Sequence, residues 1–239
     1  MSISLPKISI ITVCYNAEKN IKKTLDSILS LNYENIEVII VDGVSRDRTL
    51  EVVNKYIPML PIKIICEQDK GIYDAMNKGI ALSTGDWVIF MNSGDRFYNE
   101  KVLISIFSKE INEDVVAGSY FLEKNGRVYS PCSDLQSVKF GYILTCHQAM
   151  FFNKERLGGN IYYDLRYKVS SDNDMMMRLV KNKFKINFSD IVVCSFEDGG
   201  VSSTNSRQGS IDKYTAILRN FGLFFLIKAF LRNKFGILG

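Results

Sequence analysis

The stretch Gly85-Asp86-Trp87-Val88-Ile89-Phe90-Met91-Asn92-Ser93-Gly94-Asp95 decides the fold of this chain. Its apolar part, Trp87 to Met91, shows no polar alternation, which is typical of a strand that helices cover on both faces of a parallel sheet. The run ends abruptly in a polar turn with one carboxylate, Asp95. Because ligands bind beyond the carboxyl ends of the strands in such sheets, Asp95 is either a turn residue or a ligand group.

Three apolar runs and three segments with helical spacing alternate ahead of this stretch. The runs lie at residues 8–14, 37–41 and 62–66, and the helical segments at 17–31, 45–56 and 72–82. This β-α alternation predicts parallel strands joined by right-handed crossovers. We therefore expect an α/β fold: a single Rossmann-like domain with a mostly parallel sheet flanked by helices.

A polar side chain follows each of the four predicted strands: Asn16, Asp42, Asp69 and Asp95. Because the carboxyl ends of parallel strands meet at one edge of the sheet, we expect these groups to line a common rim. Four coincidental turn residues are the alternative explanation. An acidic rim facing a cation and a nucleotide is the interpretation that we prefer. Asn16 is also expected to be the N-cap of the first helix.

The second half of the chain has a less regular pattern. We expect helices at 102–107 and after the Ser170–Asp174 cap, and strands at 115–118, 126–129 and 191–196; residues 146–152 are expected to lead into another strand. The helix after the cap carries Met175, Met176 and Met177, which are explained more simply as core packing than as a cofactor site. No linker, repeat or low-complexity segment divides the chain.

The composition is that of an ordinary globular domain, with 239 residues, 46% hydrophobic and 23% charged. A net charge of +4 suits an anionic ligand or an acidic membrane surface, but it is weak evidence for nucleic acid, and we expect no nucleic-acid partner. The five cysteines are scattered and lack metal-type pairs, which predicts buried free thiols in a reducing cytoplasm. We find neither a signal-peptide core nor an apolar stretch long enough to span a membrane, so a cytoplasmic location is expected.

Six blocks of sequence match, in order, the pattern of a known family. They are Ile10–Asn16, Val41–Thr49, Asp69–Gly79, Phe90–Asp95, Cys146–Gln148 and Ser171–Asp174. Each block is weak alone, but together they resemble a family 2 glycosyltransferase of the GT-A fold, of the bacterial surface-polysaccharide type that makes capsule or lipopolysaccharide. The resemblance implies a nucleotide-diphosphate sugar donor, a divalent metal and inversion at the anomeric carbon.

The resemblance also implies a division of the chain and a set of donor-side residues. It gives a GT-A domain over 1–205, with a nucleotide-binding half at about 1–95 and an acceptor half at about 96–205. Asp42 and Asp69 match acids that hold the nucleotide, and Lys70 lies near the base or phosphates. Asn16 and Asn92 are carried over to the same side. A turn residue at Asp42 and a solvated Asp69–Lys70 charge pair are the alternatives.

Asp95 matches the end of the family's Asp-rich metal motif, and the resemblance makes it the metal ligand. Here the chain departs from the pattern, because Asn92 and Gly94 stand where aspartates often occur. Only one ionised oxygen donor is left, so the diphosphate is expected to supply much of the coordination. Mg²⁺ or Mn²⁺ suits such oxygen ligands.

Asp172 matches the family's general base. In a single inverting displacement, one carboxylate removes the proton of the acceptor hydroxyl, while the metal stabilises charge on the leaving diphosphate. A helix N-cap is the structural alternative for Asp172, and Ser170 or Ser171 could share that function. His147, the one histidine in the chain, and Gln148 match a turn near the acceptor or diphosphate, although a histidine before an apolar strand is usually structural.

The C-terminal segment, 206–239, is expected to be a helical extension. Tyr214, Ile217, Leu218 and Phe221 have helical spacing, and residues 224–235 are aromatic, apolar and basic. This segment is either a packed terminal helix or an interfacial helix on the anionic inner face of the cell membrane. Residues 199–202 and Arg207 are candidates to close over a bound donor, with simple loop flexibility as the alternative.

Three functions compete at this point. The first is an inverting glycosyltransferase acting on a lipid-linked saccharide. The second is a nucleotidyltransferase of similar architecture, but the glycine-rich phosphate loop usual in that class is absent from Tyr15-Asn16-Ala17-Glu18. The third is a catalytically inactive relative that binds nucleotide or acts as a scaffold, which the reduced metal motif would allow.

Overall fold

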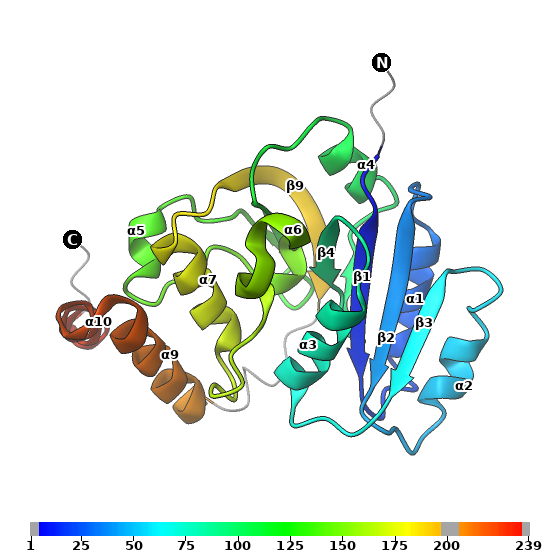
Figure 1. The fold of residues 1–239 in the computed structure, drawn as a ribbon, viewed down its shortest axis with the longest axis horizontal. Helices are drawn as coiled ribbons and strands as arrows, with labels where there is room; N and C mark the ends of the chain where they lie inside the picture. The colour runs from blue at the N-terminus through cyan, green and yellow to red at the C-terminus, as the bar shows by residue number, and fades with distance from the viewer. Residues whose placement is uncertain (1–4, 197–205, 236–239) are drawn as a thin grey trace.

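A computed structural model describes residues 5–196 and 206–235 of the chain. Nine strands form one sheet in the order β3-β2-β1-β4-β8-β6-β9-β5, and β7 pairs with β6 (Figure 1). The strands are β1 Ile8–Cys14, β2 Ile36–Asp42, β3 Ile62–Cys66, β4 Trp87–Phe90, β5 Arg96–Phe97, β6 Val115–Leu122, β7 Arg127–Tyr129, β8 Met150–Asn153 and β9 Ile186–Phe196. The first four strands are parallel, as predicted, and β6 and β9 are also parallel. Antiparallel pairing of β8 with β4 and β6 joins the two halves.

Helices cover both faces of this sheet (Figure 1). They are α1 Ile21–Leu29, α2 Thr49–Asn54, α3 Ile72–Leu82, α4 Val102–Phe107, α5 Leu135–Val138, α6 Lys154–Leu157, α7 Ser171–Lys181, α9 Ser206–Phe221 and α10 Leu223–Phe235, with 3₁₀ turns η1 His147–Ala149 and η2 Gly158–Ile161. The fold is therefore the expected mixed α/β domain with a mostly parallel sheet. None of the helices within the described ranges is long and apolar enough to cross a bilayer.

Alternation along β1 divides the core into two layers. Ile8 and Ile10 belong to the cluster under α1, α2 and α4, whereas Ile11 and Val13 belong to the cluster under α3 and α7. All four are buried, and complete burial of such a side chain stabilises the fold by about 1.5–3 kcal/mol. The apolar runs of the sequence thus fold as strands because both of their faces are covered.

A buried carboxylate fastens the other end of the sheet, where the strands begin. Glu37, 3% exposed, accepts hydrogen bonds from Ser9 Oγ at 2.6 Å, Gly85 N at 3.1 Å and Lys63 Nζ at 2.8 Å, and it also contacts Thr84. Desolvation opposes ionisation of this group, yet the hydrogen bonds from Lys63, Ser9 and Thr84 hold the pKa of Glu37 well below its usual range. The charge at Glu37 links β1, β2, β3 and the start of β4.

Several boundaries differ from the prediction. The helix expected from Ala17 begins only at Ile21, and Asn16 is not its N-cap, since Asn16 has a φ of 48°. The Oδ1 of Asn16 instead accepts a hydrogen bond from the backbone N of Arg46 at 2.8 Å. Strands β6 and β9 are longer than predicted because each supplies the other's backbone partners over most of its length.

The five cysteines are free, as predicted, but not all of them are buried. Cys14 and Cys194 are buried, whereas Cys66 is exposed at the end of the edge strand β3. The expectation of uniformly buried thiols was therefore wrong for Cys66, because an edge strand has one side open to solvent. The donor-closing role considered for residues 199–202 lies outside the described residues.

Candidate functional site

The carboxyl end of β1 lies between two groups of predicted site residues. On one side, the backbone N of Gly43, after β2, donates to Cys14 O at 3.0 Å. On the other, the backbone N of Ser93, after β4, donates to Val13 O at 3.3 Å. The carboxyl ends of β2 and β4 therefore lie on either side of the carboxyl end of β1.

The first group contains Asn16 and Asp42. Both Asn16 and Asp42 fix the loop after β2, since the backbone N of Asn16 donates to Ser45 Oγ at 2.8 Å and Asp42 Oδ2 accepts from Ser45 N at 2.8 Å. Asp42 is fully buried, and the thiols of Cys14 and Cys66 lie at 3.6 and 3.2 Å from its oxygens. Burial, and then the charge of Asp42, raises the pKa of the Cys14 thiol, so this thiol stays protonated beside the carboxylate. In this conformation, Asp42 is not exposed and holds the loop after β2 in place.

Asp69 and Lys70 complete the first group. Asp69 Oδ1 accepts from Gly71 N at 2.9 Å, and its Oδ2 lies so near Gly43 that a Cβ on that residue would be 2.7 Å away. The backbone N of Lys70 donates to Asp74 at 2.9 Å, and the Lys70 side chain is exposed. The ends of β2 and β3 therefore meet closely, and the absence of a Cβ at Gly43 leaves room for the Asp69 carboxylate.

The second group is built around the loop Asn92–Asp95. Thr24 of α1 holds this loop, since its hydroxyl contacts the carbonyl of Asp95 at 2.7 Å and accepts from Gly94 N at 2.9 Å. Gln148 Nε2 donates to Asp95 Oδ2 at 3.0 Å. Desolvation raises the pKa of Asp95 to about 6, against the opposing effect of the Gln148 hydrogen bond.

Asp172 lies in the first turn of α7 and is not its N-cap, which is Ser170. Its Oδ1 accepts from Asn173 N at 2.9 Å and lies 3.3 Å from Tyr73 Oη. Its Oδ2 lies 3.9 Å from His147 Nδ1. The Asp172 side chain is 27% exposed, so the carboxylate is both oriented by its neighbours and accessible.

The turn η1 joins the two carboxylates. His147 and Gln148 are consecutive residues, and one approaches Asp172 while the other binds Asp95. Asn92 Nδ2 lies 3.1 Å from His147 Nε2, so with the amide as donor the ring proton sits on Nδ1, which faces Asp172. Asp95 and Asp172, distant in sequence, therefore border one site.

The oxygens of the Asn92–Asp95 loop fit a divalent cation in part. Asn92 Oδ1 and Ser93 Oγ are buried, and neither has a hydrogen-bond partner within the described residues. With the Asp95 carboxylate they form a set of hard oxygen donors of the kind that Mg²⁺ and Mn²⁺ prefer. Across residues 5–196 and 206–235, no three His, Cys, Asp or Glu side chains form a complete metal site. A metal here would need further ligands from a bound molecule.

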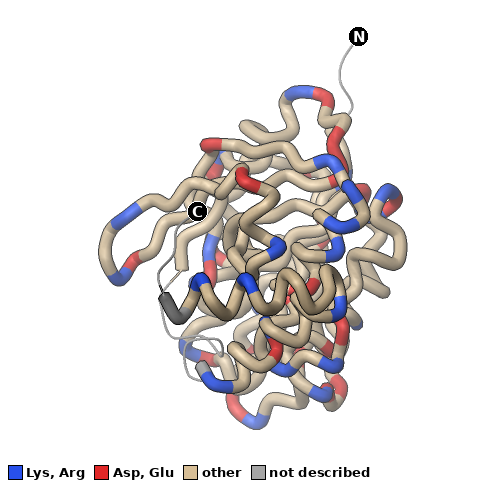
Figure 2. Tube along the Cα trace, turned by 90° about the vertical axis from the view of Figure 1, so that its left-hand side faces the viewer, with Lys and Arg blue, Asp and Glu red and all other residues tan. Residues whose placement is uncertain are grey.

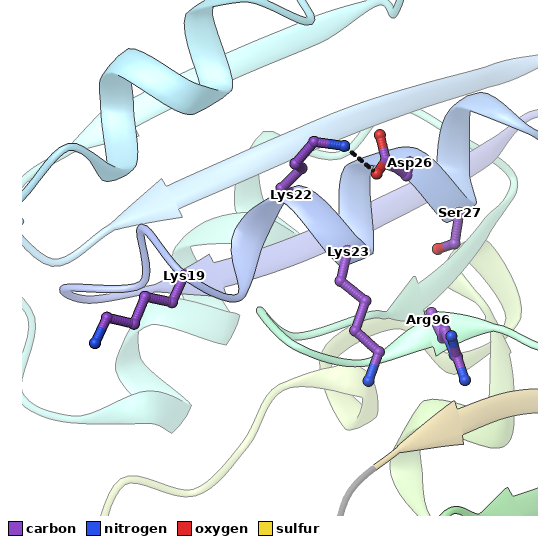
Figure 3. A pocket seen from close by; sticks show the side chains of 6 residues that line it. All are labelled: Lys19, Lys22, Lys23, Asp26, Ser27 and Arg96. Atoms are coloured by element: carbon purple, nitrogen blue, oxygen red, sulfur yellow. Dashed lines mark hydrogen bonds and ion pairs between the residues drawn. The ribbon is translucent and has the colours of Figure 1, made fainter.

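A basic pocket of about 480 Å³ lies beside this loop, on the exposed side of α1 (Figure 3). It is lined by Lys19, Lys22, Lys23, Asp26, Ser27 and Arg96. Its cations are partly compensated, because Lys22 pairs with Asp26 at 2.6 Å and Arg96 pairs with Glu123 at 3.1 Å. The pocket contains none of the predicted site residues.

Tyr73 and Thr24 are site residues that the sequence analysis missed. Tyr73 Oη donates to Val169 O at 2.6 Å, immediately before the start of α7, and burial followed by the charge of Asp172 raises the pKa of Tyr73. Tyr73 lies within one of the matching sequence blocks, which was a usable signal. Thr24 lies in the first helix and gave none.

A known protein family and several of its members match most of this chain. The family model described as glycosyl transferase family 2 matches residues 9–161. A PGL/p-HBAD biosynthesis glycosyltransferase of Mycobacterium bovis is 31% identical over 209 residues, which cover 84% of this chain and 81% of the relative. An Escherichia coli protein, UDP-Glc:alpha-D-GlcNAc-diphosphoundecaprenol beta-1,3-glucosyltransferase WfaP, is 30% identical over 141 residues, covering 57% of this chain and 55% of that protein.

Solved structures share the fold. Staphylococcus aureus TarS, residues 1–349, in complex with UDP-GlcNAc, superposes with a TM-score of 0.74 at 22% identity over 95% of this chain and 72% of TarS. The mannosyltransferase PcManGT of Pyrobaculum calidifontis, in complex with GDP-Man and Mn²⁺, has a TM-score of 0.73 at 16% identity, over 97% of this chain and 71% of that one.

Proposed function

The chain belongs to glycosyl transferase family 2, and from that premise we propose that it is an inverting glycosyltransferase that moves a sugar from a nucleotide-diphosphate sugar to a saccharide hydroxyl. The observation that carries the proposal is the turn η1, whose adjacent residues His147 and Gln148 contact Asp172 and Asp95. In this proposal Asp172 is the base for the acceptor and Asp95 is the carboxylate for the donor's metal, and the two contacts of η1 support their sharing one site.

The donor is proposed to bind along the first group and the Asn92–Asp95 loop. Asn16, Asp69 and Lys70 would contact the nucleotide, and Asp42 would act by fixing the loop after β2. Structural neighbours in complexes with UDP-GlcNAc and GDP-Man support a nucleotide-sugar donor. This arrangement fits the proposed division into a nucleotide-binding half at about 1–95 and an acceptor half at about 96–205.

In the proposed reaction, Asp172 takes the proton of the acceptor hydroxyl as that oxygen forms a bond to the anomeric carbon. The bond from this carbon to the diphosphate breaks on the opposite face, and the electron pair leaves with the diphosphate. The backbone N of Asn173 and the ring of His147 hold the Asp172 carboxylate in place, and Gln148 orients Asp95. A divalent cation bound at Asp95, Mn²⁺ or Mg²⁺, would neutralise charge on the leaving group.

The proposed acceptor is a lipid-linked saccharide in the synthesis of a surface polysaccharide such as capsule or lipopolysaccharide. The name of WfaP, a relative, describes a diphosphoundecaprenol-linked acceptor. With such an acceptor, the protein would work in the cytoplasm at the inner face of the cell membrane.

A donor screen tests the proposal. Each nucleotide sugar is added with and without Mn²⁺ in a thermal-shift assay, because a ligand that binds only the folded protein raises its Tm. The stabilising donor is then offered with a lipid-linked saccharide, and we expect a new glycosidic product with inverted configuration. Donor binding without product would favour the inactive scaffold, which the incomplete acidic set at the loop allows. Transfer of a nucleotidyl group would instead show a nucleotidyltransferase.

A further inference from the structure

The last described helix, α10, exposes one apolar face. Its members are Leu223 (61% exposed), Phe224 (61%), Ile227 (51%), Phe230 (53%) and Leu231 (42%). At 100° per residue these five side chains occupy about a third of the helix circumference. We call this set the apolar face of α10. Contiguous exposed apolar surface of this kind marks an interaction site.

The opposite side of α10 is held against the domain. Ala229 is 3% exposed, and the Phe225 ring lies 5.6 Å from the ring of Phe140. The Arg232 guanidinium stacks 3.8 Å from the centroid of the Phe140 ring. The helix is therefore fixed in orientation, and the apolar face points outward because the other side already has its partners.

Basic residues accompany the apolar face. After Asp212 the sequence contains five Lys or Arg residues, at 213, 219, 228, 232 and 234, and no Asp or Glu. Figure 2 views the side of the molecule formed by α9 and α10, and several Lys or Arg positions, in blue, lie along it. Lys228 directly flanks the apolar face, with its ammonium group 4.4 Å from the Phe224 ring centroid. A helix that exposes bulky apolar side chains and carries Lys and Arg but no acidic residue is complementary to anionic lipid headgroups.

The C-terminal helices are also tied to the helix that carries Asp172. In α9, the buried Asp212 accepts a hydrogen bond from Val169 N at 2.7 Å, just before α7 begins. Further along, Asn220 Nδ2 donates to Asp174 Oδ1 at 2.9 Å. Whatever α10 docks against is thus held in a fixed relation to the acceptor side of the site.

We propose that α10 is an interfacial helix that docks its apolar face on a leaflet rich in anionic phospholipid. Only the role of this docking rests on the proposed function: docking would bring Asp172 to an acceptor anchored in the same leaflet. Docking itself follows from the surface of α10 and needs neither donor nor turnover.

The test measures partitioning of the whole protein onto vesicles by sedimentation. Vesicles of phosphatidylcholine mixed with phosphatidylglycerol are compared with phosphatidylcholine alone, at low and high salt. We expect binding to the anionic vesicles that weakens with salt. The variant Phe224→Ser/Ile227→Ser/Phe230→Ser should lose about 100-fold in partition coefficient, since three half-exposed apolar side chains no longer enter the interface. Lys228→Glu should lose about tenfold, on anionic vesicles only.

The matched control is Ile57→Ser/Met59→Ser, which removes two equally exposed apolar side chains beyond α2, at the other end of the molecule (Figure 1). It should partition like the wild type. Equal vesicle binding by the triple variant and the wild type would overturn the proposal. The proposal would also fail if the triple substitution changed only the oligomeric state, because a second copy of the chain would then be the partner of this face. Thermal shift with the donor checks that each variant is folded. A protein that docks but transfers no sugar would refute the proposed function alone.

Discussion

Helix α7 contains two aspartates, Asp172 and Asp174, for which we expect a catalytic and a structural role. Replacing each of them by asparagine tests these two roles separately. Asp172→Asn removes the proton acceptor while keeping the shape of the side chain. Loss of a general base lowers the rate about 10²–10⁴-fold, which corresponds to about 3–5 kcal/mol at 1.36 kcal/mol per factor of ten. Because the amide oxygen introduced by this substitution would still accept from the backbone of Asn173, and because the group is partly exposed, we expect the free energy of unfolding to change by less than about 1 kcal/mol.

Asp174→Asn should do the reverse. The Asp174 side chain is 5% exposed, pairs with Arg178 Nε at 2.8 Å and accepts from Asn220 at 2.9 Å. Loss of its charge leaves the Arg178 guanidinium without its anion, at a cost of about 2–4 kcal/mol of stability. The rate per folded molecule should stay within a few-fold of the wild type, because Asp174 faces α9 and not the site.

Both variants are measured by urea denaturation and by a transfer assay with saturating donor. Wild-type turnover by Asp172→Asn, with donor binding intact, would refute the assignment of Asp172 as the base. The assignment is equally refuted if Asp172→Asn unfolds as readily as Asp174→Asn, because Asp172 would then be a structural residue. A hydrolysis assay without acceptor adds a control for donor activation at Asp95.

Three further outcomes follow from the contacts described above. Because the folded-state pKa of Glu37 is lowered, its stabilisation is present above the unfolded value of about 4.5 and is lost as the pH falls below it, so urea denaturation should show a smaller loss between pH 7 and pH 4 for Glu37→Gln than for the wild type. The folded-state pKa of Asp95 is raised to about 6, so its contribution to stability is present below about 3.8 and is lost as the pH rises through 6. Without metal, the Tm of Asp95→Asn should therefore exceed the Tm of the wild type by a larger margin at pH 8 than at pH 5. Mn²⁺ should bind the wild type more tightly above pH 6 than below it, and should hardly bind Asp95→Asn at all. Gly43→Ala places a Cβ 2.7 Å from Asp69 Oδ2 and should weaken donor binding by about tenfold in calorimetry, with a small change in Tm; unaltered affinity would remove Asp69 from the donor site.

The sequence predicted the first half of the fold well because its signals are local. An uninterrupted apolar run such as Trp87 to Met91 has few ways to be satisfied other than as a strand covered on both faces. The predicted start of the first helix was wrong at Asn16. The side-chain oxygen of Asn16 accepts a hydrogen bond from the backbone N of Arg46, and its φ of 48° excludes a helix start. Propensity could not reveal this, since the partner lies thirty positions away.

The site was predicted as a set of residues but not as a geometry. The resemblance indicated Asp95, His147, Gln148 and Asp172 as members, yet only the folded chain shows that two neighbouring residues of η1 contact the two acids. The burial of Asp42 could not be predicted either, because nothing in the sequence around it distinguishes an exposed acid at the end of a strand from a buried one.

The short strand β5 has a consequence for how the protein is made. It begins at Arg96, directly after the Asp95 loop, and its pairing partners are Cys194 and Ser195 of β9. While a ribosome is still synthesising the middle of the chain, one end of that loop has nothing to pair with. We therefore expect nascent chains that end before β9 to bind neither Mn²⁺ nor nucleotide sugar. Binding of both should arise late, in a single step, once β9 has emerged from the ribosome.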